Sequence, residues 1–189
     1  MPRAGLDSAT VIERAAQLLD ENPAEGLNLP RIAESFGVRV PSLYKHIDGM
    51  TGLRRGVTIL ARRSLSTAIA QATIGRSKND AITILATTYR AWALAHPGQY
   101  PLTIHAPVAT DEEDMTVSMS LLTVIFAVLD GYNLRDDDAV DATRFLRSTL
   151  HGFVAIETGG GFEMPRDLER SYARLVDSLV TALSTWNRQ

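Results

Sequence analysis

A short segment in the first third of the chain carries hydrogen-bonding and cationic side chains at helical spacing. Arg39, Ser42 and His46 stand at i, i+3 and i+7, which places them on one face of a helix. Tyr44 and Lys45 flank that face. A short helix with such side chains can form hydrogen bonds with base edges in the major groove of DNA. The spacing therefore predicts contact with nucleic acid.

The residues around this segment indicate a helix-turn-helix. Ala33 is small enough for a second helix to cross close to the first, and Gly37 can take the left-handed backbone conformation of a tight turn. Val38, Leu43 and Ile47 are spaced to anchor the second helix from beneath. Two surface helices joined by a tight turn would give the same pattern, so this alternative stays open.

Helical periodicity extends along nearly the whole chain, and alternation typical of strands is absent, which predicts an all-α fold. Asp7 or Ser8 can cap the first helix, which should end at Asn22-Pro23. Asn28 can cap the second helix, with Pro30 in its first turn. The later helices are expected near residues 39–46, 51–74, 80–95, 115–129, 137–157 and 165–186.

Composition excludes several classes of protein. Hydrophobic residues make up 45% and charged residues 22%, as in ordinary soluble globular proteins. With no cysteine, the chain has no disulfide, thiolate metal site or thiol nucleophile. No apolar run is long enough for a membrane helix, and residues 1–7 lack a signal core, so we expect a cytoplasmic protein without membrane contact.

Charge is distributed unevenly along the chain. Residues 1–65 contain nine Arg or Lys and seven Asp or Glu, a net charge of +2. The remaining ten Arg or Lys and fifteen Asp or Glu give −5, which makes the total −3. A mildly basic first part on an acidic body fits local contact with nucleic acid.

The first part also resembles a known family. The run Leu27-Asn28-Leu29-Pro30-Arg31-Ile32-Ala33, then Gly37-Val38, then Pro41-Ser42-Leu43-Tyr44-Lys45-His46 is similar to the DNA-binding domain of TetR-family regulators, over about residues 7–60. Beyond it, the runs 89–97 and 151–153 resemble the ligand domain of one TetR subgroup. The resemblance implies an N-terminal three-helix helix-turn-helix domain (1–50), a connecting helix (51–75) and a larger C-terminal helical domain for effector binding and dimerisation (76–189).

Roles within the DNA-binding segment follow from side-chain chemistry. Base contacts are expected from Arg39, Ser42 and His46, although Arg39 suits a phosphate equally well. Phosphate contacts are expected from Tyr44 and Lys45, and from backbone N–H groups that Asn28 orients. For Val40 and Pro41, contact with a thymine methyl group and simple packing at the helix start are equally favoured.

Three positions depart from the family pattern. Arg39 stands where a Ser or Thr cap is usual, and Arg31 replaces a common acidic residue. Met50 replaces the usual lysine at the start of the fourth helix, which removes one expected phosphate contact. Arg54 or Arg55, one turn further on, can take its place.

The last two predicted helices have wide apolar faces, which require either deep burial or a partner chain. In the family these helices build a four-helix dimer interface, and the expected contacts here are Leu150, Phe153, Leu175, Leu179 and Leu183. A buried core within one chain is the alternative. Aromatic, methionine and histidine residues beyond the hinge predicted at residues 75–79 suit an apolar small-molecule pocket, or a plain core: Tyr89, Trp92, His96, Tyr100, Met119, Phe126 and His151.

Other chemically suggestive patterns favour structural roles. His96 and His105 do not form an HExxH motif, and the acidic runs 111–114 and 136–138 lack the spacing of a calcium loop. Both acidic runs precede helices, where carboxylates favour the helix dipole. Gly159-Gly160-Gly161 follows a helix and indicates its end. We therefore expect no catalytic residues, no metal, no cofactor and no enzymatic activity.

The sequence thus predicts a homodimeric transcriptional repressor that binds a palindromic operator in double-stranded DNA and is released by a small, largely apolar effector. A regulator without a small-molecule effector is one alternative. A helical interaction module with an incidental helix-turn-helix is the other.

Overall fold

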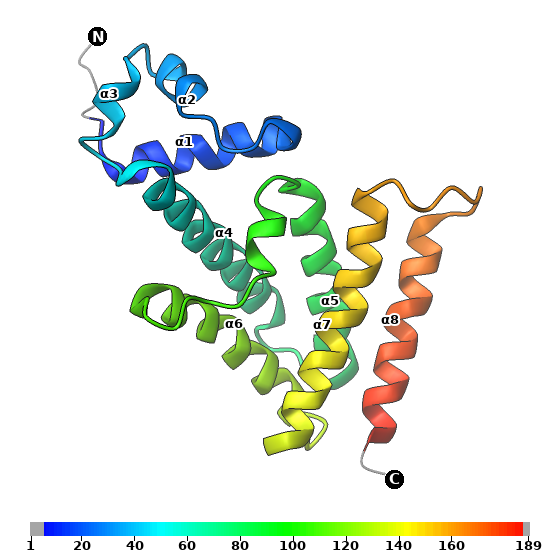
Figure 1. Cartoon of the computed structure of the whole chain (residues 1–189). Coiled ribbons are helices and arrows are strands. Elements are labelled where there is room, and N and C mark those ends of the chain that lie inside the picture. Colours follow the sequence, from blue (N-terminus) through cyan, green and yellow to red (C-terminus); the bar gives the residue numbers. More distant parts are fainter. Residues whose placement is uncertain (1–5, 187–189) are drawn as a thin grey trace. The chain divides into compact units, whose positions relative to one another are not determined.

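The computed structural model describes residues 6–186, and each regular element in that range is helical (Figure 1). The elements are α1 (Ser8–Glu21), η1 (Pro23–Glu25), α2 (Leu29–Ser35), α3 (Val40–Leu43), α4 (Gly49–Thr73), α5 (Lys78–Ala95), η2 (Tyr100–Thr103), α6 (Glu112–Asp130), α7 (Asp136–Thr158) and α8 (Leu168–Thr185), where η marks a 3-10 helix. The all-α prediction is confirmed. No helix in this range has the length and apolar character needed to cross a bilayer.

The chain divides into two compact units. Unit 1 comprises the residues up to Ser64 together with Ala95–Val117, and unit 2 comprises Leu65–Leu94 and the residues from Ser118 onward. Helices α4 and α6 contribute residues to both units. The sequence-based domain boundaries at residues 50 and 75 stay a prediction. They differ from these units chiefly because residues 95–117 are grouped with the N-terminal helices.

Local signals in unit 1 act as the sequence predicts. The Asp7 carboxylate caps α1 by accepting a hydrogen bond from the Thr10 N–H at 2.8 Å. The Asn28 side chain caps α2 by accepting from the Arg31 N–H at 3.1 Å. Gly37 has φ +64°, in the left-handed region, and so turns the chain between α2 and α3. These three caps and turns set the helix-turn-helix path.

Helix α3 is shorter than the predicted range of residues 39–46. It comprises only Val40–Leu43, and Arg39 at its N-cap gives no side-chain capping hydrogen bond. Beyond it, the N–H groups of His46 and Ile47 donate to the Leu43 carbonyl, so the chain continues as turns. The predicted segment 39–46 therefore consists of one helical turn and the turns that follow it, so the prediction of one regular helix over these residues is wrong.

The core of unit 1 holds these short helices in place. Apolar side chains from α1, α2, α3 and the first part of α4 form one cluster: Val11, Ala15, Ala16, Leu18, Leu19, Leu29, Ile32, Ala33, Leu43, Ile47, Leu53 and Val57. Of the three residues expected to anchor the second helix from beneath, Leu43 and Ile47 are buried, whereas Val38 is partly exposed. A Cβ on Gly56 would lie 2.4 Å from Ile12 Cδ1, so α4 approaches α1 closely there.

A hydrogen-bond network attaches the segment after α5 to α1. The Asp20 carboxylate accepts from the N–H groups of Gly98 (3.0 Å) and Gln99 (2.9 Å) and from Gln99 Nε2 (2.6 Å). His96 Nδ1 lies 2.8 Å from the same carboxylate. Gly98 is required, because a Cβ there would lie 2.2 Å from the Leu19 carbonyl oxygen. One carboxylate thus fixes a four-residue turn against the first helix.

In unit 2, α5, α7 and α8 lie side by side (Figure 1). The Tyr172 hydroxyl on α8 donates to the Ala86 carbonyl on α5 at 2.6 Å, and the Tyr172 ring lies 5.0 Å from that of Phe153 on α7. Burial raises the pKa of the Tyr172 hydroxyl. The buried Tyr172 side chain therefore connects α8 with both α5 and α7.

The residues expected at a dimer interface are mostly buried within the single chain. Leu150, Leu179 and Leu183 are at most 2% exposed, and Phe153 is 9% exposed. Leu175 is partly exposed. The apolar stripe of α8 thus fills the interior of unit 2, which is the alternative that the sequence left open. The assignment of these residues to an interface stays a prediction, and the exposed positions of α7 and α8 are better placed to meet a second copy.

The Asp20 network can be tested by substitution. Asp20→Ala should lower the free energy of unfolding by roughly 2–3 kcal/mol, because buried backbone donors lose a charged acceptor. Chemical denaturation followed by circular dichroism measures the change.

Glu21→Ala is the matched control, since Glu21 is exposed and pairs with Arg14 and Arg31 at 3.3 and 3.5 Å in solvent. Its effect should stay within about 0.5 kcal/mol. Equal effects of the two substitutions would contradict the role assigned to Asp20.

Candidate nucleic-acid interface

Five of the residues expected to contact DNA lie on α3 and the segments next to it, and each is at least partly exposed. Arg39 and Lys45 are exposed, Tyr44 is 56% exposed, and Ser42 and His46 are partly exposed. Tyr44 therefore does not pack in the core. These side chains are available to a partner along α3 and the turns that follow it.

The remaining three expected residues differ in their exposure. Asn28 is partly buried, and its side chain is engaged as the cap of α2. Val40 is partly buried and packs against the core of unit 1, whereas Pro41 is exposed in the first turn of α3. The burial of Val40 thus favours packing at the helix start as its role. The apolar surface of Pro41 is accessible to a partner.

Most arginine side chains of unit 1 already have carboxylate partners. Arg31 pairs with Glu25 at 2.8 Å, which explains why an arginine is tolerated where the family has an acidic residue. Arg55 forms two hydrogen bonds with Asp111, at 2.5 and 2.8 Å, and one with Glu113 at 2.9 Å. Arg63 pairs with Glu113 at 3.2 Å. Carboxylates of the protein itself therefore partly neutralise the charges of these arginines.

Three cationic side chains of unit 1 lack such partners. Within residues 6–186, no hydrogen bond or ion pair engages the side chains of Arg39, Lys45 or Arg54. All three are exposed. Met50, at the start of α4, is also exposed, and Arg54 follows it by one helical turn. The available positive charge therefore lies along α3 and the first turns of α4.

The acidic run 111–114 pairs with α4, which was not predicted from the sequence. Asp114 and Arg62 form an ion pair in which each side chain is 7% exposed, and Arg62 also donates to the His105 carbonyl at 2.6 Å. The Asp114 carboxylate accepts from the Val108 N–H at 3.0 Å. A signal was present in the sequence, because Arg55, Arg62 and Arg63 recur at i, i+7 and i+8 on one face of α4.

The expected effector residues are divided between the units. His96 and Tyr100 belong to unit 1, where His96 contacts Asp20 and Tyr100 is buried. The others belong to unit 2: Tyr89 and Trp92 are buried on α5, Met119 and Phe126 are 48% and 37% exposed on α6, and His151 is partly buried on α7. Burial, and then the charge of Arg147, lowers the pKa of His151. Their grouping into one pocket stays a prediction.

Comparison with known proteins identifies relatives over the whole length of the chain. A family model described as "Tetracyclin repressor-like, C-terminal domain" matches residues 82–179. The HTH-type transcriptional regulator Rv0681 of Mycobacterium tuberculosis is 32% identical over 158 residues, which are 83% of this chain and 72% of that protein. The HTH-type transcriptional regulator YobS of Bacillus subtilis is 29% identical over 192 residues, with 99% and 97% of the two chains covered.

A solved structure has the same fold. The crystal structure of a TetR variant from Acinetobacter baumannii in complex with minocycline superposes with a TM-score of 0.72. The match covers 96% of this chain and 98% of that chain, at 20% identity. The similarity in fold therefore includes residues of both units.

The pairing of Arg55 with Asp111 predicts an altered titration. Hydrogen bonds from Arg55 hold the pKa of Asp111 at about 2, below its ordinary value of 3.8. A carboxylate with a lowered pKa stabilises the fold above pH 3.8 and loses that contribution as the pH falls through 2. Arg55→Met should raise the pKa of Asp111 most of the way to 3.8, as measured by carboxyl NMR titration.

Arg63→Met is the control, because Arg63 pairs with Glu113 and not with Asp111. It should leave the pKa of Asp111 unchanged. If Asp111 kept its low pKa in the Arg55→Met variant, the N–H group of Asp114, the next largest cause, would be responsible instead.

Proposed function

Because this chain belongs to the TetR family of transcriptional regulators, we propose that it is a dimeric repressor that binds a palindromic operator and is released by a small effector. Family membership makes it a DNA-binding regulator of transcription. The interaction module with an incidental helix-turn-helix is thereby set aside. The repressor role, the operator and the effector are parts of the proposal.

The observation that carries the DNA-binding site is the unequal engagement of its cations. Arg31, Arg55, Arg62 and Arg63 have carboxylate partners, whereas Arg39, Lys45 and Arg54 do not. An unpaired cationic side chain that binds a phosphate releases counterions condensed on the DNA. An arginine that is already paired must first break its ion pair with the carboxylate, which reduces the net gain. The sites of strongest phosphate contact should therefore follow α3 and the start of α4.

Within this surface, chemistry separates two roles. Lys45, Tyr44 and Arg54 suit phosphate oxygens, which position the protein without reading sequence. Arg54 takes the place of the family's lysine at Met50, and Arg55 does not, because Asp111 and Glu113 engage it. Arg39, Ser42 and His46 suit base edges.

The dimer is proposed to form through exposed faces of α7 and α8. Gly152 lies in the middle of α7, although glycine destabilises a helix interior by about 0.5–1 kcal/mol relative to alanine. Inside the single chain no atom lies within 4 Å of a Cβ placed there, so packing within unit 2 does not require glycine. Ser148 and Ala155, one turn away on either side, are also small and exposed. Close approach of a helix from a second copy explains a glycine at this position.

A small-molecule effector is supported by the family and by the relative bound to minocycline. A regulator controlled by abundance or by a protein partner is the second candidate. Loss of operator affinity on addition of a small molecule distinguishes the first from the second.

DNA binding is tested by comparing phosphate and base contacts. Lys45→Ala and Arg54→Ala should each reduce the slope of log affinity against log salt by about one, because each removes one counterion-releasing contact. His46→Ala should instead cost about 1–3 kcal/mol at particular base pairs and relax preference there. Fluorescence anisotropy with an inverted repeat from the gene's upstream region measures both.

Arg55→Ala is the matched control for Arg54→Ala, since it removes an adjacent arginine whose charge is already paired. Its salt slope should equal that of the unmodified protein. Unchanged slopes for both Lys45→Ala and Arg54→Ala would contradict the assigned surface.

The dimer is tested by Gly152→Gln. The single chain has room for this side chain, so the helical content should be retained or slightly increased, whereas the α7 face should no longer admit a partner helix. Sedimentation velocity should show a dimer for the unmodified protein and a monomer for the variant.

Ala127→Gln makes the same exposed side chain on α6 and should leave the dimer intact. A dimer that survives Gly152→Gln would place the interface elsewhere.

A further inference from the structure

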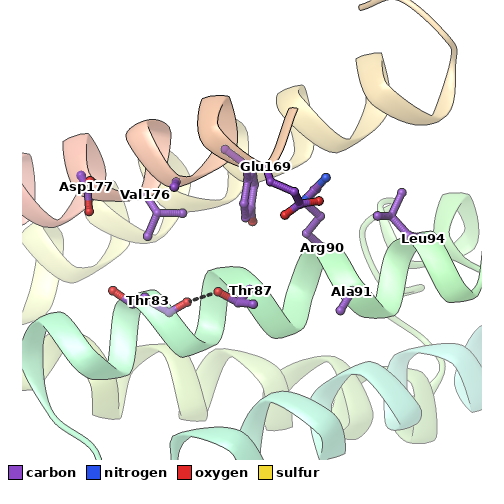
Figure 2. Close-up of a pocket in the computed structure, with 10 residues that line it drawn as sticks. Thr83, Thr87, Arg90, Ala91, Leu94, Glu169, Val176 and Asp177 are labelled. Atoms are coloured by element: carbon purple, nitrogen blue, oxygen red, sulfur yellow. Dashed lines mark hydrogen bonds and ion pairs between the residues drawn. The ribbon is translucent and has the colours of Figure 1, made fainter. Parts of the chain in front are cut away.

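A groove of about 370 Å³ runs between α5 and α8 in unit 2 (Figure 2). Helix α5 lines it with Thr83, Thr87, Arg90, Ala91 and Leu94, and helix α8 lines it with Glu169, Tyr172, Ala173, Val176 and Asp177. Small side chains contribute part of this lining from both helices, namely Thr83, Thr87 and Ala91 on α5 and Ala173 on α8. It involves none of the residues that the sequence assigned to an effector.

A buried arginine lies in the wall of this groove. Arg90 is 7% exposed, and its side chain extends from α5 toward α8 (Figure 2). Its Nε and Nη2 donate to the two oxygens of Glu157, at 2.8 and 2.6 Å, and its Nη1 donates to Glu169 at 2.8 Å. The guanidinium also lies 4.8 Å from the centre of the Tyr172 ring. One arginine thus holds two carboxylates.

The two carboxylates are held with unequal strength. The Glu157 side chain is 11% exposed, so its departure would leave a buried charge unpaired, which is strongly unfavourable. The Glu169 side chain is 76% exposed, and an ion pair so open to water contributes little. Arg90 Nη1 is therefore a fixed donor whose present acceptor can be exchanged.

We propose that this groove binds a small monocarboxylate with an apolar body, whose carboxylate replaces that of Glu169 on Arg90 Nη1. The apolar body would cover Ala91, Leu94, Ala173 and Val176, which gives the ligand a source of affinity that Glu169 lacks. Glu169 acts as an internal competitor that occupies the donor when no ligand is present.

The charge around the site permits this exchange. The Glu169 side chain is 76% exposed, so after displacement it can turn into solvent, where its repulsion of the ligand carboxylate is screened. Asp177 is the other acidic residue of the groove, eight residues after Glu169 on the same helix. At 1.5 Å per residue the two lie about 12 Å apart along the axis, beyond the screening length at physiological salt. Repulsion from Asp177 is therefore weak.

The proposal does not depend on operator binding, so it can fail while the proposed function stands. Isothermal titration calorimetry on the full chain would use three probes of equal chain length: hexanoate, 1-hexanol and hexylammonium. Hexanoate should bind the unmodified protein saturably, and the other two should bind much more weakly.

Two variants at exposed positions make the test specific. Glu169→Gln removes the competitor and should tighten hexanoate binding about tenfold. Ala173→Leu fills the groove and should abolish binding. Asp141→Asn, at an exposed carboxylate on α7 that pairs with Arg144, removes the same charge from unit 2 and should have no effect. Circular dichroism establishes that each variant is folded.

Three results would overturn the proposal. The first is no saturable binding of hexanoate to either the unmodified protein or Glu169→Gln at millimolar concentration. The second is weaker binding of hexanoate to Glu169→Gln, which would mean that Glu169 contacts the ligand. The third is preferential binding of hexylammonium, which would make the groove a site for organic cations.

Discussion

The buried ion pair between Arg62 and Asp114 determines much of the arrangement of unit 1. Two opposite charges can be stable so far from water only with further hydrogen bonds, and both partners have them. Arg62 donates to the His105 carbonyl, and Asp114 accepts from the Val108 N–H, so the loop before α6 is held by the same pair. The loop in turn brings Asp111 and Glu113 to Arg55 and Arg63. This pair thus helps to hold the loop whose carboxylates engage Arg55 and Arg63.

The sequence predicted the elements whose causes are local. The Asp7 and Asn28 caps and the turn at Gly37 depend on residues within four positions of each other, and all three occur in the structure. The length of α3 was overestimated, because side-chain spacing continues through a turn as it does through a helix. The Asp20 and Asp114 networks were missed because they join residues far apart in the chain. The spacing of the arginines on α4 indicates a cationic face, but it does not indicate which acidic run contacts that face.

The apolar patterns predicted that faces of α7 and α8 are buried. They did not predict whether the same chain or a second copy buries them. Leu179 and Leu183 would look the same in the sequence whether they met α5 of the same chain or a helix of a second copy. The structure shows them buried within the chain. The glycine at 152 is more informative about a partner, because nothing in the single chain requires it. The aromatic residues of α5 illustrate the same limit, since a core and a ligand pocket select the same side chains.

The brevity of α3 limits how much sequence information one copy can extract from DNA. A single turn with its following residues presents a few side chains to base edges, and each distinguishes one or two base pairs. A genome offers about a million or more competing sites, so an operator that occurs only once must be specified over roughly ten base pairs. One recognition surface of this size supplies too few. In the proposed dimer, a second copy would bind the inverted repeat of the same short sequence, and the energy of bending or narrowing the DNA between the two half-sites would add further discrimination.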